Sequence, residues 1–246
     1  MDEHRAKILI LVEGAKTDVA LMKHLLDVYG IGERHEIVSY NTNIYVLYNM
    51  MFRDENPESL DLLQVLKEWE KDEEKKKIFD ERYSDILLIC DLDPQDRLYD
   101  EVKIREMLLH FSESSDNGKL YLNYPMVEAF YHMKSIPDED YYSYVVSLEE
   151  LKNKAYKKRV QLESRDKDYR KFAKTKQECD FVIAQNYKKA QIISCNKSQE
   201  SISTSLDIFT AQAEKIRSEA RLHVLSTCGF YIMDYNSNLI ELEKIV

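Results

Sequence analysis

The chain has 246 residues, of which 44% are hydrophobic and 33% charged, and a formal net charge of -10. This length fits one large domain or one domain with an appendage, and 5 Gly and 4 Pro are too few for a turn-rich all-β fold. A uniformly acidic surface repels a polyanion, which excludes general adhesion to nucleic acid unless a local basic patch overrides it.

The cysteine and targeting patterns indicate a reducing compartment. The chain has no CxxC pair, so neither a zinc site nor a disulfide framework is indicated for its four scattered cysteines: Cys90, Cys179, Cys195 and Cys228. The first residues pass into an apolar run without a signal-peptide pattern, and no run approaches the length of a membrane span. We therefore expect a cytoplasmic protein with no membrane contact.

The first part of the chain predicts a strand followed by a helix. Residues 8–12 form an apolar run that ends in Glu13 and Gly14, typical of a strand buried on both faces. Apolar residues then recur at helical spacing up to Tyr29. The next predicted elements are a strand over 36–40 and helices over 44–52 and 62–69, with the charged run 71–77 as the solvated end of the last helix.

A second strand-and-helix unit follows. Residues 85–90 form another apolar run, and Asp91 and Asp93 follow it. A helix over 102–111, a strand over 120–122 and a helix over 126–132 are predicted next. Strands that alternate with helices indicate an α/β fold with a parallel sheet covered on both sides.

Composition changes near residue 140. We expect residues 1–140 to form the α/β domain and residues 141–246 to form an α-helical C-terminal region, with a helix near 183–190 and another over 206–224. Glycine is absent from this region until Gly229. The apolar stripe of the later helix suggests contact with a partner subunit or a second copy of the chain.

Three acids are predicted to meet at one edge of the sheet. Glu13, Asp91 and Asp93 each follow a strand, and open α/β folds place their ligands outside the carboxyl ends of parallel strands. Converging carboxylates repel one another unless a proton or a divalent cation neutralises them. This predicts a site for Mg²⁺, or for Mn²⁺ in its place; the alternative is that the acids only cap the following helices.

The two acidic strand ends resemble those of the TOPRIM domain, the magnesium-binding fold of topoisomerases, primases, small ribonucleases and the OLD-like and RloB-like nucleases. The resemblance rests on Val12-Glu13-Gly14 after one apolar run and on Asp91-Leu92-Asp93 after a second. It implies a Rossmann-like TOPRIM fold in which Glu13 is the general acid or base. It further implies that Asp91 and Asp93 hold Mg²⁺ against phosphate oxygens.

Two further residues near Glu13 are candidates for the site. The order Glu13-Gly14-Ala15-Lys16-Thr17-Asp18 resembles the Glu-Gly-x-Lys-Thr-acid turn of RloB-like proteins. The resemblance implies that Asp18 helps to bind a metal ion and that Lys16 belongs to the catalytic set. Lys16 alternatively binds a phosphate at the start of the following helix.

A later segment adds a metal ligand by the same resemblance. Residues 123–128 are similar to an Asn-Pro-x-x-Glu segment of RloB-like proteins, which implies that Glu128 joins the site, with His132 one turn further along. Glu128 alternatively caps a helix start. Gln95 stands where several TOPRIM enzymes have a third aspartate and Asp96 is displaced by one position, so the sequence leaves the role of Asp96 open.

A basic segment interrupts the acidic chain. Residues 152–176 contain eleven Lys or Arg against three acids, a local charge of +8 that leaves -18 for the other residues. Tyr156, Tyr169 and Phe172 are interleaved, so cations would follow a phosphate backbone while aromatic rings stack on bases. The alternative is a solvated segment that pairs with acidic residues of this chain or of a partner.

These patterns lead to two classes of function. The first is a Mg²⁺-dependent TOPRIM nuclease acting on DNA or RNA, which the resemblance extends to an effector of bacterial phage defence; an RNA-processing ribonuclease is its enzymatic rival. The chain has no Walker A sequence, so an ATPase would be a separate subunit. The second is a noncatalytic regulatory or assembly subunit with the same fold.

Overall fold

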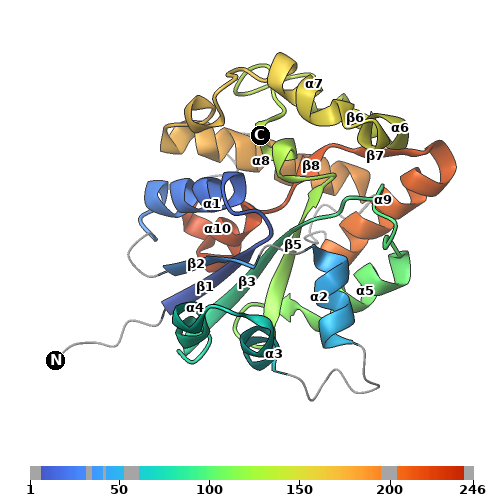
Figure 1. Cartoon of the computed structure of the whole chain (residues 1–246). Coiled ribbons are helices and arrows are strands. Elements are labelled where there is room, and N and C mark those ends of the chain that lie inside the picture. Colours follow the sequence, from blue (N-terminus) through green and yellow to red (C-terminus); the bar gives the residue numbers. More distant parts are fainter. Residues whose placement is uncertain (1–6, 32–34, 41–42, 53–60, 195–203, 241–246) are drawn as a thin grey trace.

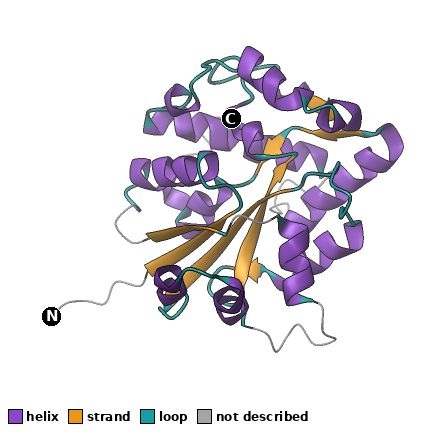
Figure 2. Cartoon of the chain, in the orientation of Figure 1, coloured by secondary structure: helices purple, strands orange, loops and turns teal. Residues whose placement is uncertain are grey.

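A computed structural model describes residues 7–31, 35–40, 43–52, 61–194 and 204–240. The protein has an α/β fold with a mostly parallel mixed sheet that is flanked by helices, a Rossmann-like arrangement (Figures 1 and 2). The strand order is β2-β1-β3-β5-β4, and β8 also pairs with β5. The fold class predicted from the alternating strands and helices is confirmed to this extent.

The elements have the following bounds. The strands are β1 (Lys7–Val12), β2 (His35–Ser39), β3 (Tyr83–Asp91), β4 (Ser112–Glu113), β5 (Gly118–Tyr124), β6 (Val145–Ser147), β7 (Arg221–His223) and β8 (Leu225–Ser226). The α-helices are α1 (Thr17–Val28), α2 (Ile44–Met51), α3 (Leu62–Trp69), α4 (Glu73–Ile78), α5 (Glu101–His110), α6 (Leu148–Lys152), α7 (Ala155–Glu163), α8 (Lys176–Ile193), α9 (Ser205–Glu219) and α10 (Phe230–Tyr235). The 3₁₀ helices are η3 (Val127–Tyr131), η4 (Tyr141–Ser143), η5 (Tyr169–Lys171) and η6 (Ser237–Leu239).

The central strands are parallel and buried on both faces. β1 pairs with β2 on one side and with β3 on the other, and β3 pairs with β5. Residues 8–12 are almost inaccessible, as are residues 87–90, because helices cover both faces. The register places Val12 opposite Ile89 and Asp91 opposite Asn123, so the three strands end together.

Helices form a layer on each face of the sheet. Figure 1 shows α1, α8 and α10 on one face and α2 to α5 on the other, with α9 beside α5 at the edge. Tyr29 at the end of α1 donates a hydrogen bond to Asp180 of α8, and Tyr121 of β5 donates one to Asp234 of α10. These contacts join the later helices to the first half of the chain.

The region after residue 140 contains strands as well as the expected helices. β6 pairs with β7, and β8 pairs with β5 through Asn123 and Ser226. The helix predicted to continue through Val224 ends at Glu219, because Ala220 adopts a left-handed conformation with φ 52°. Val224 lies between β7 and β8 and is fully buried.

Two other predicted helices differ from the structure. Residues 73–78 form a separate helix, capped by the Asp72 side chain, because Glu70 is extended and ends α3. The helix predicted over 126–132 is the short 3₁₀ helix η3, in which the Ala129 amide bonds the carbonyl of Met126.

The described cysteines are free and buried, as expected for packing residues: Cys90, Cys179 and Cys228. Cys195 lies outside the described residues. No helix in the described part of the chain combines the length and apolar character needed to cross a membrane.

Candidate active site

Glu13 and Asp91 meet at the point where the strand order of the sheet reverses. From β1 the chain leads by way of α1 to β2 on one side, whereas β3 lies on the other side, so the ends of β1 and β3 form the switch point at which open α/β folds place ligands. Glu13 directly follows β1, and Asp91 is the last residue of β3. The Asp91 amide donates a hydrogen bond to Oε2 of Glu13 over 3.3 Å. The structure thus brings this predicted pair into contact.

Asp93 lies in a turn just beyond β3. Its amide donates a hydrogen bond to the Pro125 carbonyl over 3.0 Å, and its side chain accepts one from Gln95 over 2.8 Å. Its φ is 41°, in the left-handed region that non-glycine residues rarely adopt. Such strained residues are common at functional sites, where the surrounding structure holds them in place.

Asp18 enters the site from the first turn of α1. Its side chain is 5% exposed, and it packs so closely on Gly14 that a Cβ atom at Gly14 would lie 2.4 Å from Oδ2 of Asp18. A glycine after Glu13 is therefore required for Asp18 to keep this position. We call Glu13, Asp18, Asp91, Asp93 and Glu128 the acid cluster.

Electrostatics favour protons on the buried carboxyls of the acid cluster, those of Glu13, Asp18, Asp91 and Asp93. Burial, assisted by the charges of Asp93 and Asp18, raises the pKa of Glu13 to about 8. Burial also raises the pKa of Asp18 to about 6 and those of Asp91 and Asp93 above their usual range. The charge of Glu13, whose side chain accepts a hydrogen bond from the Asp91 amide, raises the pKa of Asp91 further. The cluster therefore holds more negative charge than its surroundings stabilise.

Glu128 lies at the rim of the acid cluster and pairs with the basic segment. Its Oε1 is 3.1 Å from Nζ of Lys157 on α7, and its Oε2 is buried without a hydrogen-bond partner among the described residues. Partial burial opposes charge on Lys157, but Glu128, Asp91 and Asp93 raise its pKa. In Figure 1, α7 lies beyond the end of the sheet where the acids gather. One cation of the basic segment thus faces the acid cluster.

Asn123 is a site residue that the sequence did not identify. It is fully buried at the end of β5, donates a hydrogen bond to Oδ1 of Asp91 over 3.1 Å and accepts one from Ser226 over 2.7 Å. It thereby holds Asp91 in place from one side. Its position opposite Asp91 is a consequence of strand register, which the residue pattern alone does not give.

Three other candidates lie at or outside the margin of the cluster. Lys16 is the exposed residue before α1 and makes no ion pair with a described residue. Asp96 accepts a hydrogen bond from Asn43 over 3.2 Å and adds its charge to the field at Glu13. His132 is fully buried and bonds Tyr156 and Glu163, so its predicted place beside Glu128 on a helical face is wrong. The physical reason is that η3 turns more tightly than an α-helix.

The basic segment divides into paired and available cations. Several of its side chains form ion pairs within the chain: Arg159 with Glu150 and Glu163, Arg165 with Glu178, Arg170 with Asp168, and Lys176 with Asp180. The predicted stacking of Tyr156 and Phe172 on bases is wrong, because their side chains are 1% and 0% exposed and belong to the core. The side chain of Tyr169 lies outside the described part of the structure.

The donor set of the acid cluster fits a partly hydrated Mg²⁺. Mg²⁺ prefers carboxylate oxygens as ligands, usually binds one or two protein carboxylates and keeps several of its waters. Oε2 of Glu128 has no hydrogen-bond partner among the described residues, so it is a carboxylate oxygen that could bind the ion. Among the described residues, no three His, Cys, Asp or Glu side chains lie close enough to enclose a metal ion by themselves. The described residues of the cluster therefore do not form a closed metal cage, and an ion held there would need water or substrate oxygens as further ligands.

Comparison with models of known protein families finds no match. Comparisons with curated proteins and with solved structures find no similar chain either.

Proposed function

We propose that this chain is a Mg²⁺-dependent nuclease of the TOPRIM type that hydrolyses phosphodiester bonds in DNA or RNA. The observation that carries the proposal is the contact of Glu13 with Asp91 at the strand-order switch point, among further carboxylates and beside a lysine-bearing helix. A buried group of acids is costly unless it serves a cation or a proton transfer, so it favours a functional site.

The residues of the cluster have distinct proposed roles. Bound Mg²⁺ would neutralise the charge that develops on the phosphoryl group during hydrolysis. Asp91 and Asp93 would hold the ion, with Asn123 keeping Asp91 oriented through its hydrogen bond. Glu13 accepts the proton of the attacking water, and its pKa near neutrality suits a general base. The oxygen of that water forms a bond to phosphorus, the P–O bond to the leaving sugar oxygen breaks, and the leaving oxygen takes up a proton from solvent water.

A noncatalytic subunit is the second candidate. The observation in its favour is that no group of three potential metal ligands converges in the described part of the chain. In this case the chain would bind a partner subunit and would not catalyse hydrolysis. On the resemblance to OLD-like and RloB-like proteins alone, we also propose that either form acts in phage defence with a separate ATPase subunit.

A cleavage assay with matched variants tests the proposal. The purified chain is incubated with Mg²⁺ and with duplex DNA, single-stranded DNA and structured RNA. Glu13→Gln and Asp91→Asn are expected to abolish cleavage, whereas Asp116→Asn, in an exposed turn between β4 and β5, is expected to retain it. Unchanged cleavage in both cluster variants contradicts the nuclease assignment, and cleavage of structured RNA alone favours the RNA-processing form.

A further inference from the structure

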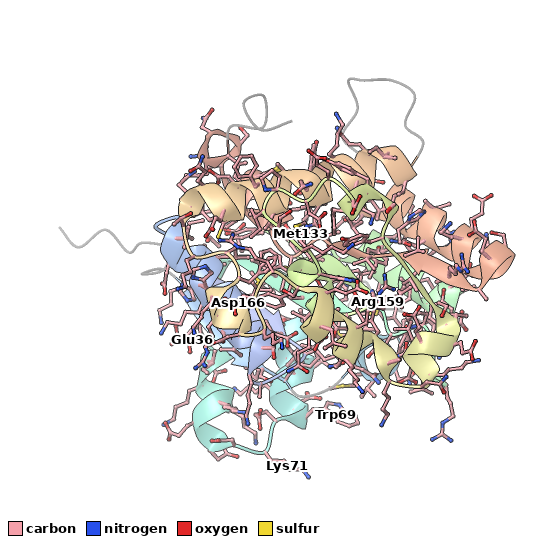
Figure 3. All side chains as sticks on the ribbon, turned by 90° about the horizontal axis from the view of Figure 1, so that it is seen from above. Glu36, Trp69, Lys71, Met133, Arg159 and Asp166 are labelled. Carbon is pink, nitrogen blue, oxygen red and sulfur yellow. The ribbon has the colours of Figure 1, made fainter. Side chains whose placement is uncertain are left out.

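A groove of about 410 Å³ lies between α7, the loop after it and η3. Its charged lining consists of Lys154, Lys157, Lys158 and Lys167 against Glu128 and Asp166. We call it the lysine groove. In Figure 3, Arg159 and Asp166 mark this part of the chain near the middle of the view, whereas Trp69 and Lys71 lie at the lower edge of the molecule.

The cations of the lysine groove are available for a ligand. Lys154, Lys158 and Lys167 are exposed and form no ion pair with a described residue, in contrast to the paired arginines of the same segment. Lys154 directly precedes α7 and has a left-handed backbone conformation, and Lys158 lies in the first turns of the helix; both line the groove. The groove thus gathers three of the lysines of the basic segment that form no ion pair with a described residue.

The lysine groove adjoins the acid cluster. Lys157 and Glu128 form an ion pair and both line the groove, and the charges of Asp91 and Asp93 act on Lys157. Thr17, which also lines the groove, directly precedes Asp18 of the cluster. Ser164 lies in the lining with an Oγ that has no hydrogen-bond partner among the described residues. The lysine groove and the acid cluster therefore share Glu128.

The size and surroundings of the groove favour one strand over a duplex. Its volume lies in the range of pockets that enclose a single group of small-molecule size. A duplex carries two backbones separated by grooves about 6 and 12 Å wide, so it needs a broad basic surface. The net charge of the chain is -10, and in the described part of the structure the arginines next to the groove, Arg159 and Arg165, are paired with acids, which leaves less positive charge for a second backbone.

We propose that the lysine groove binds the sugar–phosphate backbone of one unpaired nucleic-acid strand and leads it to the acid cluster. The substrate of this site is then single-stranded DNA or RNA. Lys154, Lys158 and Lys167 bind its phosphates without reading the bases. The inference rests on the proposed nuclease function for the reaction, but strand binding is a separate property.

Fluorescence anisotropy with the full chain in EDTA tests strand binding without cleavage. The probes are a labelled oligothymidylate, an oligouridylate and a duplex of the same length, over a range of salt concentrations. We expect the single strands to bind more tightly than the duplex. In the triple variant Lys154→Gln, Lys158→Gln, Lys167→Gln, affinity falls on the order of tenfold and the slope of log K against log salt decreases by roughly 2.

The matched control changes three lysines of the same segment that lie outside the groove: Lys152→Gln, Lys171→Gln and Lys174→Gln. It removes the same charge and is expected to change neither affinity nor slope. Equal losses in the two triple variants, duplex binding as tight as single-strand binding, or no single-strand binding each overturn the proposal.

Failure of this inference is distinguishable from failure of the proposed function. If the chain cleaves nucleic acid with Mg²⁺ but the groove variant binds single strands as tightly as the wild type, the role of the lysine groove is contradicted and the nuclease assignment stands. Groove-dependent binding without cleavage under any divalent cation overturns the nuclease assignment and leaves the strand-binding groove standing.

Discussion

The amide of Asp91 donates a hydrogen bond to the carboxylate of Glu13 over 3.3 Å, although the two residues are 78 positions apart in the chain. The contact follows from the parallel pairing of β1 with β3, which ends both strands at the same edge of the sheet. The pKa of each carboxyl is raised by burial, and the charge of Glu13 adds to this effect at Asp91. A cation at this edge of the sheet would stabilise the charged form of both carboxyls and lower both pKa values.

The acid cluster predicts that stability falls as pH rises. The pKa of Glu13 is raised from its ordinary value of 4.5 to about 8, so the folded chain keeps a proton that the unfolded chain releases. Between these values the free energy of unfolding decreases by at most about 1.4 kcal/mol per pH unit from this group, and the effect is complete above about pH 8. Urea unfolding in EDTA at several pH values measures it.

Glu13→Gln provides the comparison for this pH dependence. Glutamine cannot ionise, so the variant is expected to lose less stability than the wild type over the same pH range. Saturating Mg²⁺ is expected to flatten the wild-type curve, because a cation stabilises the charged carboxylates. A variant curve parallel to that of the wild type in EDTA would show that Glu13 is an ordinary carboxyl.

Asn123→Ala is expected to destabilise the protein and to misplace Asp91. The side chain is fully buried and bonds both Asp91 and Ser226, so its removal takes one buried hydrogen-bond partner from each of them. We expect a loss of roughly 2 to 4 kcal/mol in the free energy of unfolding, with weaker divalent-cation binding. The exposed Asn117→Ala serves as the control. A loss of stability no larger than in the control would contradict this role for Asn123.

Lys157→Ala is expected to strengthen divalent-cation binding. Lys157 places a positive charge 3.1 Å from Glu128, where it competes with a metal ion for the same carboxylate. Loss of a partly exposed pair of this kind changes free energy by roughly 0.5 to 1 kcal/mol, or about two- to fivefold in affinity. Mn²⁺ titration followed by electron paramagnetic resonance measures the change. The control is Lys158→Ala, which removes the adjacent lysine that forms no ion pair with a described residue and should change Mn²⁺ affinity less. Weaker Mn²⁺ binding by Lys157→Ala would contradict the proposal that Lys157 competes with the metal ion for Glu128.

Phe172 is expected to stabilise the core and to take no part in strand binding. Its ring is fully buried and packs edge-on against Phe130 and Tyr131 at centroid distances of 6.2 and 5.6 Å. Phe172→Ala should lower the free energy of unfolding by about 3 to 5 kcal/mol, whereas Leu162→Ala, 67% exposed, should change it by less than about 0.5 kcal/mol. The milder Phe172→Leu variant should bind oligonucleotides normally, and reduced affinity in this folded variant would restore a stacking role.

The central strands and their acids were predictable because their signals are local. An uninterrupted apolar run followed by an acid predicts a buried strand and its end, which located Glu13 and Asp91 correctly at the ends of β1 and β3. Helical spacing likewise predicted α1, whose buried face includes Leu21, Leu25 and Leu26. Parallel pairing then follows from the intervening helices.

Other features depend on contacts between distant segments. β8 has two residues and no periodic pattern, so its pairing with Asn123 could not be predicted. The aromatic residues Tyr156 and Phe172 lie in a charged run but are buried, because their side chains point to the core while neighbouring lysines face solvent. The apolar stripe expected to contact a partner is also internal, since Phe209 and Ala213 are fully buried.

The most direct measurement for the central claim is Mn²⁺ binding to the wild type and to Asp91→Asn, followed by electron paramagnetic resonance. Asparagine keeps the acceptor for Asn123 but removes the charge. The account predicts that the wild type binds Mn²⁺, that Mg²⁺ displaces it, and that Asp91→Asn binds it at least tenfold more weakly while unfolding no more readily. Equal binding by the two proteins, or no binding by the wild type, would contradict a metal site at the ends of β1 and β3.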